Sequence, residues 1–230
     1  MFVGHFGVGF AAKGLAPKTS VGTLVLSAML ADLLGFAFIA VGIEHIAIQP
    51  GITRVNALNL YDFAWSHSLF MDVVWGALLA CAYLLLRHYR RGACIIFAGV
   101  LSHWVLDWVS HRPDMALVPG FHRYFGLGLY NSPIGLLLVE GSIWIAGIIV
   151  YLQTTRSKGL AGNLALWTFI VIFTALWLLS FNGAPPPSLH ILVFVDLFLF
   201  PIIIGWMYWV DHLREPRQSN TLAASSVPTT

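Results

Sequence analysis

Three side chains that could bind a metal ion follow one another at four-residue intervals. They are His103, Asp107 and His111, and residues four apart lie on the same face of an α-helix. Imidazole nitrogens and carboxylate oxygens together are ligands of zinc and its neighbouring transition metals. Asp114 follows three residues later, after Pro113, at which we expect the regular helix to end. The segment therefore predicts part of a divalent-metal site, with zinc as the first choice and manganese as the second.

One helix face seldom supplies a full coordination shell, so other segments must contribute ligands. The candidates are His5, Asp32 and His67, which lie in or beside other apolar runs. Asp72 and Glu140 also lie within apolar runs, where a free carboxylate could accept a proton from water during hydrolysis. They are the candidate catalytic residues. The predicted ligands are His5, Asp32, His67, His103, Asp107 and His111.

The carboxylates within apolar runs are costly if they stand alone. Asp32, Asp72, Asp107, Glu140 and Asp196 all lie in such runs. A charge at the centre of a bilayer costs on the order of 2.5–3.5 kcal/mol even on the lenient insertion scale. Five isolated charges would cost about 15 kcal/mol, comparable to the whole stability of a typical protein. We expect most of them to be paired, protonated, hydrated or metal-bound, the alternative for any single residue being a hydrogen bond between helices.

The elements that position these residues are apolar helices. The chain has 230 residues, of which 58% are hydrophobic and 10% charged, against about 25% charged in a typical soluble domain. This composition excludes a soluble globular enzyme, and a net charge of +2 gives no surface for nucleic acid. Apolar runs of roughly 20 residues, each long enough to cross a bilayer as a helix, predict an all-α, polytopic membrane domain over residues 1–210. The six runs are 21–43, 65–86, 93–110, 133–153, 163–181 and 189–210.

The two ends of the chain and the loops predict an orientation. Residues 2–12 are too short to span, and we expect a half-length helix that enters from the outer side and turns at 14–20. The alternative is an amphipathic segment on the inner surface. Nine Lys and Arg residues lie in one set of loops and three in the other, and the richer set marks the cytoplasmic side. The loops 44–64 and 111–132 are then outside, and the polar residues 211–230 form a loose cytoplasmic tail.

Four short motifs surround the candidate ligands. They are Gly4-His5-Phe6, Ala31-Asp32-Leu33-Leu34, Ser66-His67-Ser68, and Leu101-Ser102-His103 followed by Asp107. Over about residues 1–115 the chain thereby resembles the YdjM-type family of membrane-bound metal-dependent hydrolases, first associated with a LexA-regulated inner-membrane protein. The resemblance implies a multi-pass hydrolase of the bacterial inner membrane whose metal site is formed by these motifs.

The chain departs from the family pattern at two of the motifs. The second acid of the family's Pro-Asp-x-Asp motif is missing after Asp32, and Asp62-Phe63-Ala64 stands where the family has His-Arg-Gly. Asp62, His111 and Asp114 could replace the missing ligands; otherwise the site holds one metal ion where relatives hold two, or none. The order of His and Asp residues is more distantly similar to that of zinc-dependent phospholipase C, which implies phosphodiester chemistry.

The predicted function is hydrolysis of a phosphoester in a membrane lipid or lipid-linked substrate. One alternative is a transporter that relays protons or metal ions, and another is a structural membrane protein with paired polar helices. The histidines of the candidate site gather toward the outer side, and the cytoplasmic half lacks a series of ionisable residues, which favours an enclosed site over a pathway. No nucleic-acid partner is expected, and the oligomeric state is left open.

Overall fold

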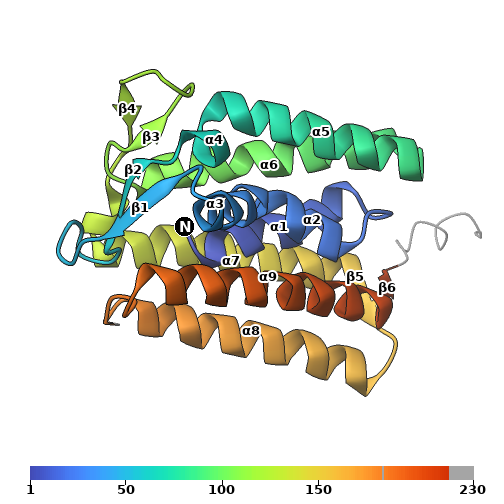
Figure 1. Cartoon of the computed structure of the whole chain (residues 1–230). Helices are drawn as coiled ribbons and strands as arrows, with labels where there is room; N and C mark the ends of the chain where they lie inside the picture. Colours follow the sequence, from blue (N-terminus) through green and yellow to red (C-terminus); the bar gives the residue numbers. More distant parts are fainter. Residues whose placement is uncertain (183, 218–230) are drawn as a thin grey trace, which may run out of the picture.

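The computed structural model describes residues 1–182 and 184–217, which are mostly α-helical (Figure 1). Five helices are long and apolar enough to cross a membrane, and a bent pair, α2 (Val21–Ala28) with α3 (Leu30–Ala40), makes a sixth candidate. The predicted runs therefore correspond to helices. The five long helices are α5 (Leu69–Arg87), α6 (Arg90–Ser110), α7 (Pro133–Thr154), α8 (Leu160–Ser180) and α9 (Leu189–His212).

The first predicted span is broken near its middle. The axes of α2 and α3 differ by 59°, and Met29 between them has φ −112° and ψ 6°, outside regular helix. No hydrogen bond joins the carbonyl of Ala28 to the amide of Asp32 among the described residues, although a continuous helix would form one. The break therefore releases one backbone acceptor at the depth of the candidate ligands.

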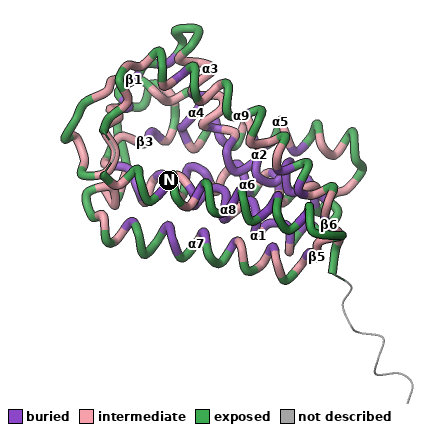
Figure 2. Tube along the Cα trace, turned by 90° about the horizontal axis from the view of Figure 1, so that it is seen from below, coloured by how far each residue is buried: buried purple, intermediate pink, exposed green. Residues whose placement is uncertain are grey.

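The short helix α1 (Val3–Leu15) lies inside the bundle. It contacts α7, α2 and α6, and Figure 2 shows it among the buried, purple segments at the centre. Its 13 residues rise about 20 Å, well short of a bilayer's thickness. The expected half-length helix is present, and its burial among other helices contradicts the alternative of a surface-lying segment.

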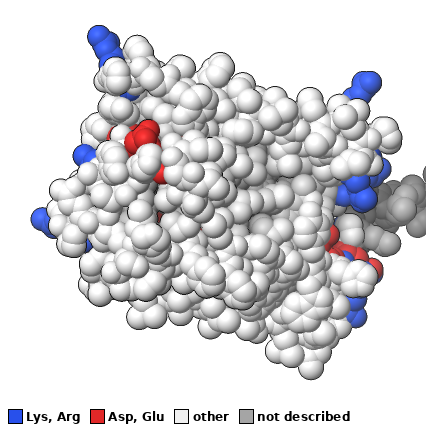
Figure 3. All heavy atoms as spheres, in the orientation of Figure 1, with Lys and Arg blue, Asp and Glu red and all other residues white. Residues whose placement is uncertain are grey.

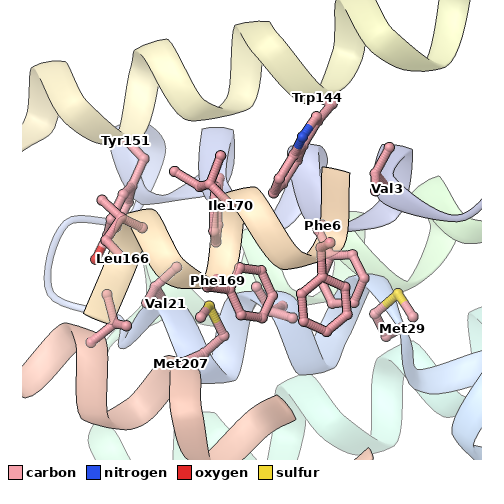
Figure 4. Packing of buried hydrophobic residues seen from close by; sticks show 14 of the residues in the cluster. Val3, Phe6, Val21, Met29, Trp144, Tyr151, Leu166, Phe169, Ile170 and Met207 are labelled. Carbon is pink, nitrogen blue, oxygen red and sulfur yellow. The ribbon is translucent and has the colours of Figure 1, made fainter. Parts of the chain in front are cut away.

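Aromatic side chains hold α1 in place. Phe6 and Phe10 are fully buried and pack against α8, where the rings of Phe169 and Phe173 stack with their centroids 4.2 Å apart (Figure 4). Trp144 of α7 covers Phe10 from the other side, with ring centroids 5.4 Å apart. Such aromatic pairs are worth about 0.5–1.5 kcal/mol each beyond the area they bury, so they fix the position of α1 and of the candidate ligand on it.

Short strands close the two ends of the bundle, where the sequence predicted only loops. At the hairpin end, β1 (His45–Ile48) pairs with β2 (Leu58–Asp62), and β3 (Met115–Ala116) pairs with β4 (Tyr124–Phe125). The short helices α4 (Ala64–His67) and η1 (Leu129–Asn131) complete this end. At the opposite end, β5 (Thr155–Ser157) pairs with β6 (Arg214–Pro216). The chain is therefore mostly helical rather than all-α.

The sides of the bundle are apolar. Figure 3 shows Lys, Arg, Asp and Glu gathered toward the two ends, with a wide uncharged band between them on that face. Large apolar side chains project outward from the long helices, for example Phe194, which is 71% exposed, and Leu179, which is 69% exposed. Such a band is compatible with a membrane protein.

The first part of the expected loose tail, residues 211–217, is ordered instead. α9 continues to His212, and β6 then pairs with β5. The carboxylate of Asp211 accepts a hydrogen bond from Lys13 Nζ at 2.7 Å, which ties the end of α9 to α1. Residues 211–217 are thus part of the fold, while the rest of the expected tail, 218–230, lies outside the described residues.

Candidate metal centre

Four side chains from three elements bring their donor atoms together. Asp32 Oδ1 of α3 lies 3.3 Å from His67 Nε2 of α4 and 3.6 Å from His103 Nε2 of α6, and the two Nε2 atoms are 3.3 Å apart. Asp107 Oδ2, one turn after His103, lies 3.2 Å from His103 Nε2 and 4.0 Å from His67 Nε2. Tetrahedral zinc with bonds of about 2.0–2.1 Å places its donors roughly 3.3 Å from one another. Asp32, His67 and His103 fit such a site, and Asp107 lies beside it, nearest to His103.

The outer ring nitrogens of both histidines are already bound. His103 Nδ1 donates to the carbonyl of Ala28 at 2.8 Å, which is the acceptor released by the break between α2 and α3. His67 Nδ1 lies 2.7 Å from Ser66 Oγ, whose own hydrogen goes to Glu44 Oε2 at 2.6 Å. With Nδ1 protonated, neutral imidazole keeps its lone pair on Nε2. Hydrogen bonds of this kind orient the histidines of metal sites.

His5 approaches the cluster from α1. Its Nε2 lies 3.2 Å from Asp107 Oδ1, and its ring stacks on that of His103 with centroids 4.0 Å apart. The Met1 nitrogen also bonds to Asp107 Oδ1. Together with His103 and Asp107, His5 forms a second group of three donors within 4.8 Å of one another. Because Asp107 Oδ1 is occupied in this way, Oδ2 is left facing the other histidines.

His111 follows α6 directly, and its backbone N–H still donates to the carbonyl of Asp107 at 2.7 Å, as in a continuing helix. α6 ends at Ser110, and His111 is extended, with φ −73° and ψ 151°. Its Nε2 lies 3.9 Å from Asp107 Oδ2, and its Nδ1 lies 3.3 Å from Asp114 Oδ1. The four-residue spacing therefore brings His111 toward Asp107 as the sequence predicted, although the regular helix ends one residue earlier. His111 borders the cluster but belongs to neither group of three donors.

The two candidate catalytic carboxylates lie outside both groups of donors. Asp72 is fully buried in the first turn of α5, and neither of its oxygens has a hydrogen-bond partner among the described residues. Glu140 instead accepts hydrogen bonds from the backbone N–H groups of Phe2 and Gly4 and from the indole of Trp177. These contacts make Glu140 a cap for the N-terminus of α1.

Two cavities meet at Asp32, whose side chain is 27% exposed. A cavity of about 100 Å³ lies under the β1–β2 hairpin and is lined by His67, Asp107 and His111 as well as Asp32. A larger cavity of about 590 Å³ extends from Asp32 between α3, α8 and α9. Among the described residues that line it, Asp32 and Asp196 are the acidic ones. The cluster therefore opens sideways, between helices, into a mainly apolar space.

The sequence missed the contacts that support the ligands. Glu44, just after the first predicted apolar run, is fully buried and accepts hydrogen bonds from both the N–H and the hydroxyl of Ser66. Burial raises the pKa of the Glu44 carboxyl above its usual value. Asp62, a possible replacement ligand, instead faces solvent with its carboxylate 2.8 Å from His45 Nδ1. No local pattern relates Glu44 to Ser66, since the β1–β2 hairpin separates them in the chain.

No family model, curated protein or solved structure matches the chain. The resemblance to the YdjM-type hydrolases therefore stays a prediction based on four short motifs. What the described residues add is a buried group of His and Asp side chains that could hold a metal ion. Its function has to be inferred from that arrangement and from the space beside it.

Proposed function

We propose that the chain is a membrane-embedded, metal-dependent hydrolase whose metal ligands are Asp32, His67, His103 and Asp107. The observation that carries the proposal is that His103 belongs to two groups of three donors, one with Asp32 and His67 and one with His5 and Asp107. The Met1 nitrogen is a cationic partner for Asp107 through Oδ1. The donor atoms of Asp32, His67 and His103 still offer lone pairs to one another, so they need a cation or protons between them. Buried carboxylates without such a partner would be strongly destabilising.

The residues around the proposed metal ion have different roles. A divalent ion, with zinc favoured over manganese by the imidazoles, would supply Lewis-acid polarisation of a phosphoryl oxygen and a lowered pKa for water. His5 holds Asp107 through Oδ1, and Glu140 holds the helix that carries His5. Asp72, whose oxygens have no partner among the described residues, is the carboxylate free to accept a proton.

The shape of the larger cavity supports a lipid phosphoester as the substrate. Its walls are mainly apolar and come from α3, α8 and α9, for example Phe36, Phe173 and Leu199. A phosphoester placed at Asp32 would leave its hydrocarbon chain between α8 and α9, in surroundings that match it. The polar group of Asp196 on the same wall would contact a hydroxyl or amine of the substrate.

The proposed setting is the bacterial inner membrane, with the C-terminus in the cytoplasm. The end of the bundle that carries β5 and β6 also carries nine of the twelve Lys and Arg residues, as the positive-inside rule requires of the cytoplasmic side. The hairpin end, with the candidate metal centre beneath it, would then face outward. A substrate in the outer leaflet could reach Asp32 from the side.

The first test is metal content, measured by elemental mass spectrometry on detergent-purified protein. Wild type should carry stoichiometric zinc or manganese, and His103→Ala should lose it while keeping its helical circular dichroism. His190→Ala, which removes an exposed histidine of α9, is the matched control and should keep the metal. Full metal occupancy in His103→Ala would contradict the ligand assignment.

The second test separates hydrolysis from transport. Metal-loaded wild type should release phosphate or a phosphoalcohol from phospholipid in mixed micelles, and His103→Ala should not. Uptake of the divalent ion into proteoliposomes, with no hydrolysis of any phospholipid offered, would instead support the transporter alternative. The rate of hydrolysis by Asp72→Asn tests the proton acceptor separately, because that variant should retain its metal.

A further inference from the structure

A second polar pocket lies at the end of the bundle opposite the candidate metal centre. Its volume is about 480 Å³, and it exists because β6 pairs with β5, with Ser157 opposite Arg214 in the register. In Figure 1 this end carries the labels β5 and β6, far from the label N. The polar residues lining it are Gln153, Thr155, Arg156, Ser157, Asn163, Arg214 and Arg217.

Arg214 lines this pocket and is only 6% exposed. Its Nε donates to Thr155 Oγ1 at 3.0 Å, its Nη2 to the carbonyl of Thr155 at 3.3 Å, and its Nη1 to Asn163 Oδ1 at 3.4 Å. The guanidinium also lies 5.4 Å from the centre of the Tyr151 ring. Every one of these partners is neutral, so the contacts orient the charge without balancing it.

No carboxylate compensates Arg214. Within residues 1–182 and 184–217, its guanidinium forms no salt bridge, and positions 183 and 218–230 contain no Asp or Glu. Burial lowers the pKa of this guanidinium, yet an arginine stays protonated in proteins. A buried cation with no counter-charge is destabilising, which indicates that an anion from outside the chain completes the pocket.

Two further arginines stand at the rim. Arg156 donates from Nε to Glu215 Oε1 at 2.7 Å, and both side chains are largely exposed. Arg217 is exposed, and its backbone N–H is fixed by the carbonyl of Thr154 at 2.9 Å. The three arginines that line the pocket therefore have one glutamate to balance them, and two of their positive charges have no carboxylate partner among the described residues.

We propose that this pocket binds a phosphate group. The planar fork of a guanidinium matches two phosphate oxygens at once, and Arg214 is held in the lining of the pocket by neutral partners alone. Ile149 and Leu152 continue the lining along α7, so the phosphate of an anionic lipid would leave its acyl chains on an apolar helix face. A free inorganic phosphate offers the same oxygens, and the experiment distinguishes the two sources.

The test measures binding to the full chain, purified in detergent and stripped of lipid. The probes are phosphatidylglycerol in mixed micelles, phosphatidylcholine at the same concentration, and inorganic phosphate. Wild type should bind phosphatidylglycerol, and Arg217→Gln should bind it about tenfold more weakly, as expected for loss of one charge-assisted contact. Arg91→Gln makes the same charge change at the same end, outside the pocket, and should bind like wild type.

The source of the phosphate follows from competition. Displacement of phosphatidylglycerol by inorganic phosphate supports the pocket with free phosphate as a ligand, and binding without displacement supports the lipid head group. Equal weakening by Arg91→Gln and Arg217→Gln would overturn the proposal, since it would show attraction to the whole end of the bundle. Equal binding by wild type and Arg217→Gln would also overturn it.

Two more variants keep the test informative. Arg214→Gln should lose binding most, but this residue supports the β5–β6 pair, so Arg156→Gln stands in for it if the protein does not fold. His103→Ala should bind phosphatidylglycerol like wild type, because the pocket and the candidate metal centre share no residue. Failure of the proposed hydrolase function would therefore leave the phosphate pocket unaffected.

Discussion

The hydroxyl of Ser66 should control how tightly the candidate centre holds its metal. It lies between a ligand and a buried carboxyl, 2.7 Å from His67 Nδ1 and 2.6 Å from Glu44 Oε2. Ser66→Ala removes the acceptor of the Nδ1 hydrogen and the donor to Glu44. The backbone N–H of residue 66, which bonds to Glu44 Oε1 at 2.8 Å, survives the change, so the local fold should persist.

The loss of zinc affinity in Ser66→Ala depends on which other contacts restrain the His67 ring. Loss of an outer hydrogen-bond partner typically weakens metal binding 10–100-fold. Phe63 packs on the His67 ring with centroids 4.2 Å apart, and this contact keeps much of the ring's orientation. We therefore expect the lower end of that range, about tenfold weaker binding of zinc, or about 1.4 kcal/mol.

The assay is competition for zinc between the detergent-purified protein and a coloured chelator. Ser102→Ala is the matched control, because Ser102 precedes His103 as Ser66 precedes His67, yet its hydroxyl donates only to the carbonyl of Gly99 at 2.6 Å. It should bind zinc like wild type. If Ser66→Ala binds zinc as tightly as Ser102→Ala does, the hydrogen bond does not orient the ligand and the reasoning is refuted.

Three further changes test the support of the site. Glu140→Ala leaves the first turn of α1 and the Trp177 indole without their acceptor, so the free energy of unfolding should fall by about 3 kcal/mol, measured by denaturation in mild detergent. Gly7→Ala would place a Cβ 2.6 Å from the backbone oxygen of Ile143, so thermal unfolding should show a loss of about 1–3 kcal/mol. Glu44→Gln should change how stability depends on pH, because burial raises the pKa of the Glu44 carboxyl in the folded state. Wild type should therefore lose stability relative to the variant as pH rises from about 4 through the raised pKa.

Each of these has an outcome that would contradict it. Gly205→Ala is the control for the α1–α7 contact, since no atom lies within 4 Å of the added Cβ, and the better helix former should stabilise α9 by about 1 kcal/mol. If Gly7→Ala and Gly205→Ala changed the free energy of unfolding equally, close packing of α1 against α7 would be excluded as the cause of the loss in Gly7→Ala. Unchanged stability in Glu140→Ala would show that water replaces the hydrogen bonds to the Glu140 carboxylate. If the stability of wild type and of Glu44→Gln varied with pH in parallel, Glu44 would not be the titrating group.

The sequence was most informative where structure depends on local pattern. Long apolar runs correspond to helices because hydrophobicity along a run is what selects a helix in an apolar environment. The i, i+4 spacing of His103 and Asp107 placed both side chains on one face, since both fall before the end of α6. The same spacing brought His111 Nε2 to within 3.9 Å of Asp107 Oδ2, although α6 ends at Ser110. The sequence did not show where the helix ends, because helix ends depend on contacts that the pattern does not contain.

The remaining features depend on contacts between distant residues. Nothing near Ala28 in the sequence marks a break, because the break is stabilised by a bond from His103, which lies four helices further along the chain. Glu140 was a reasonable candidate base by residue type, but its neighbours at the start of α1 bind its oxygens. Residue type predicts which chemistry is available, whereas tertiary contacts decide which groups remain free for it.

The burial of α1 also bears on how the protein is made. α1 leaves the ribosome well before α7 and α8, yet its aromatic side chains pack against both. In the proposed membrane setting, α1 has neither the length to span the bilayer nor the partners that enclose it until those helices are inserted. His5 is a residue of α1, so the group that it forms with His103 and Asp107 can assemble only after α1 has packed against the other helices. Biogenesis should therefore end with α1 docking, and a chain truncated before α7 should insert its earlier helices without acquiring the complete cluster.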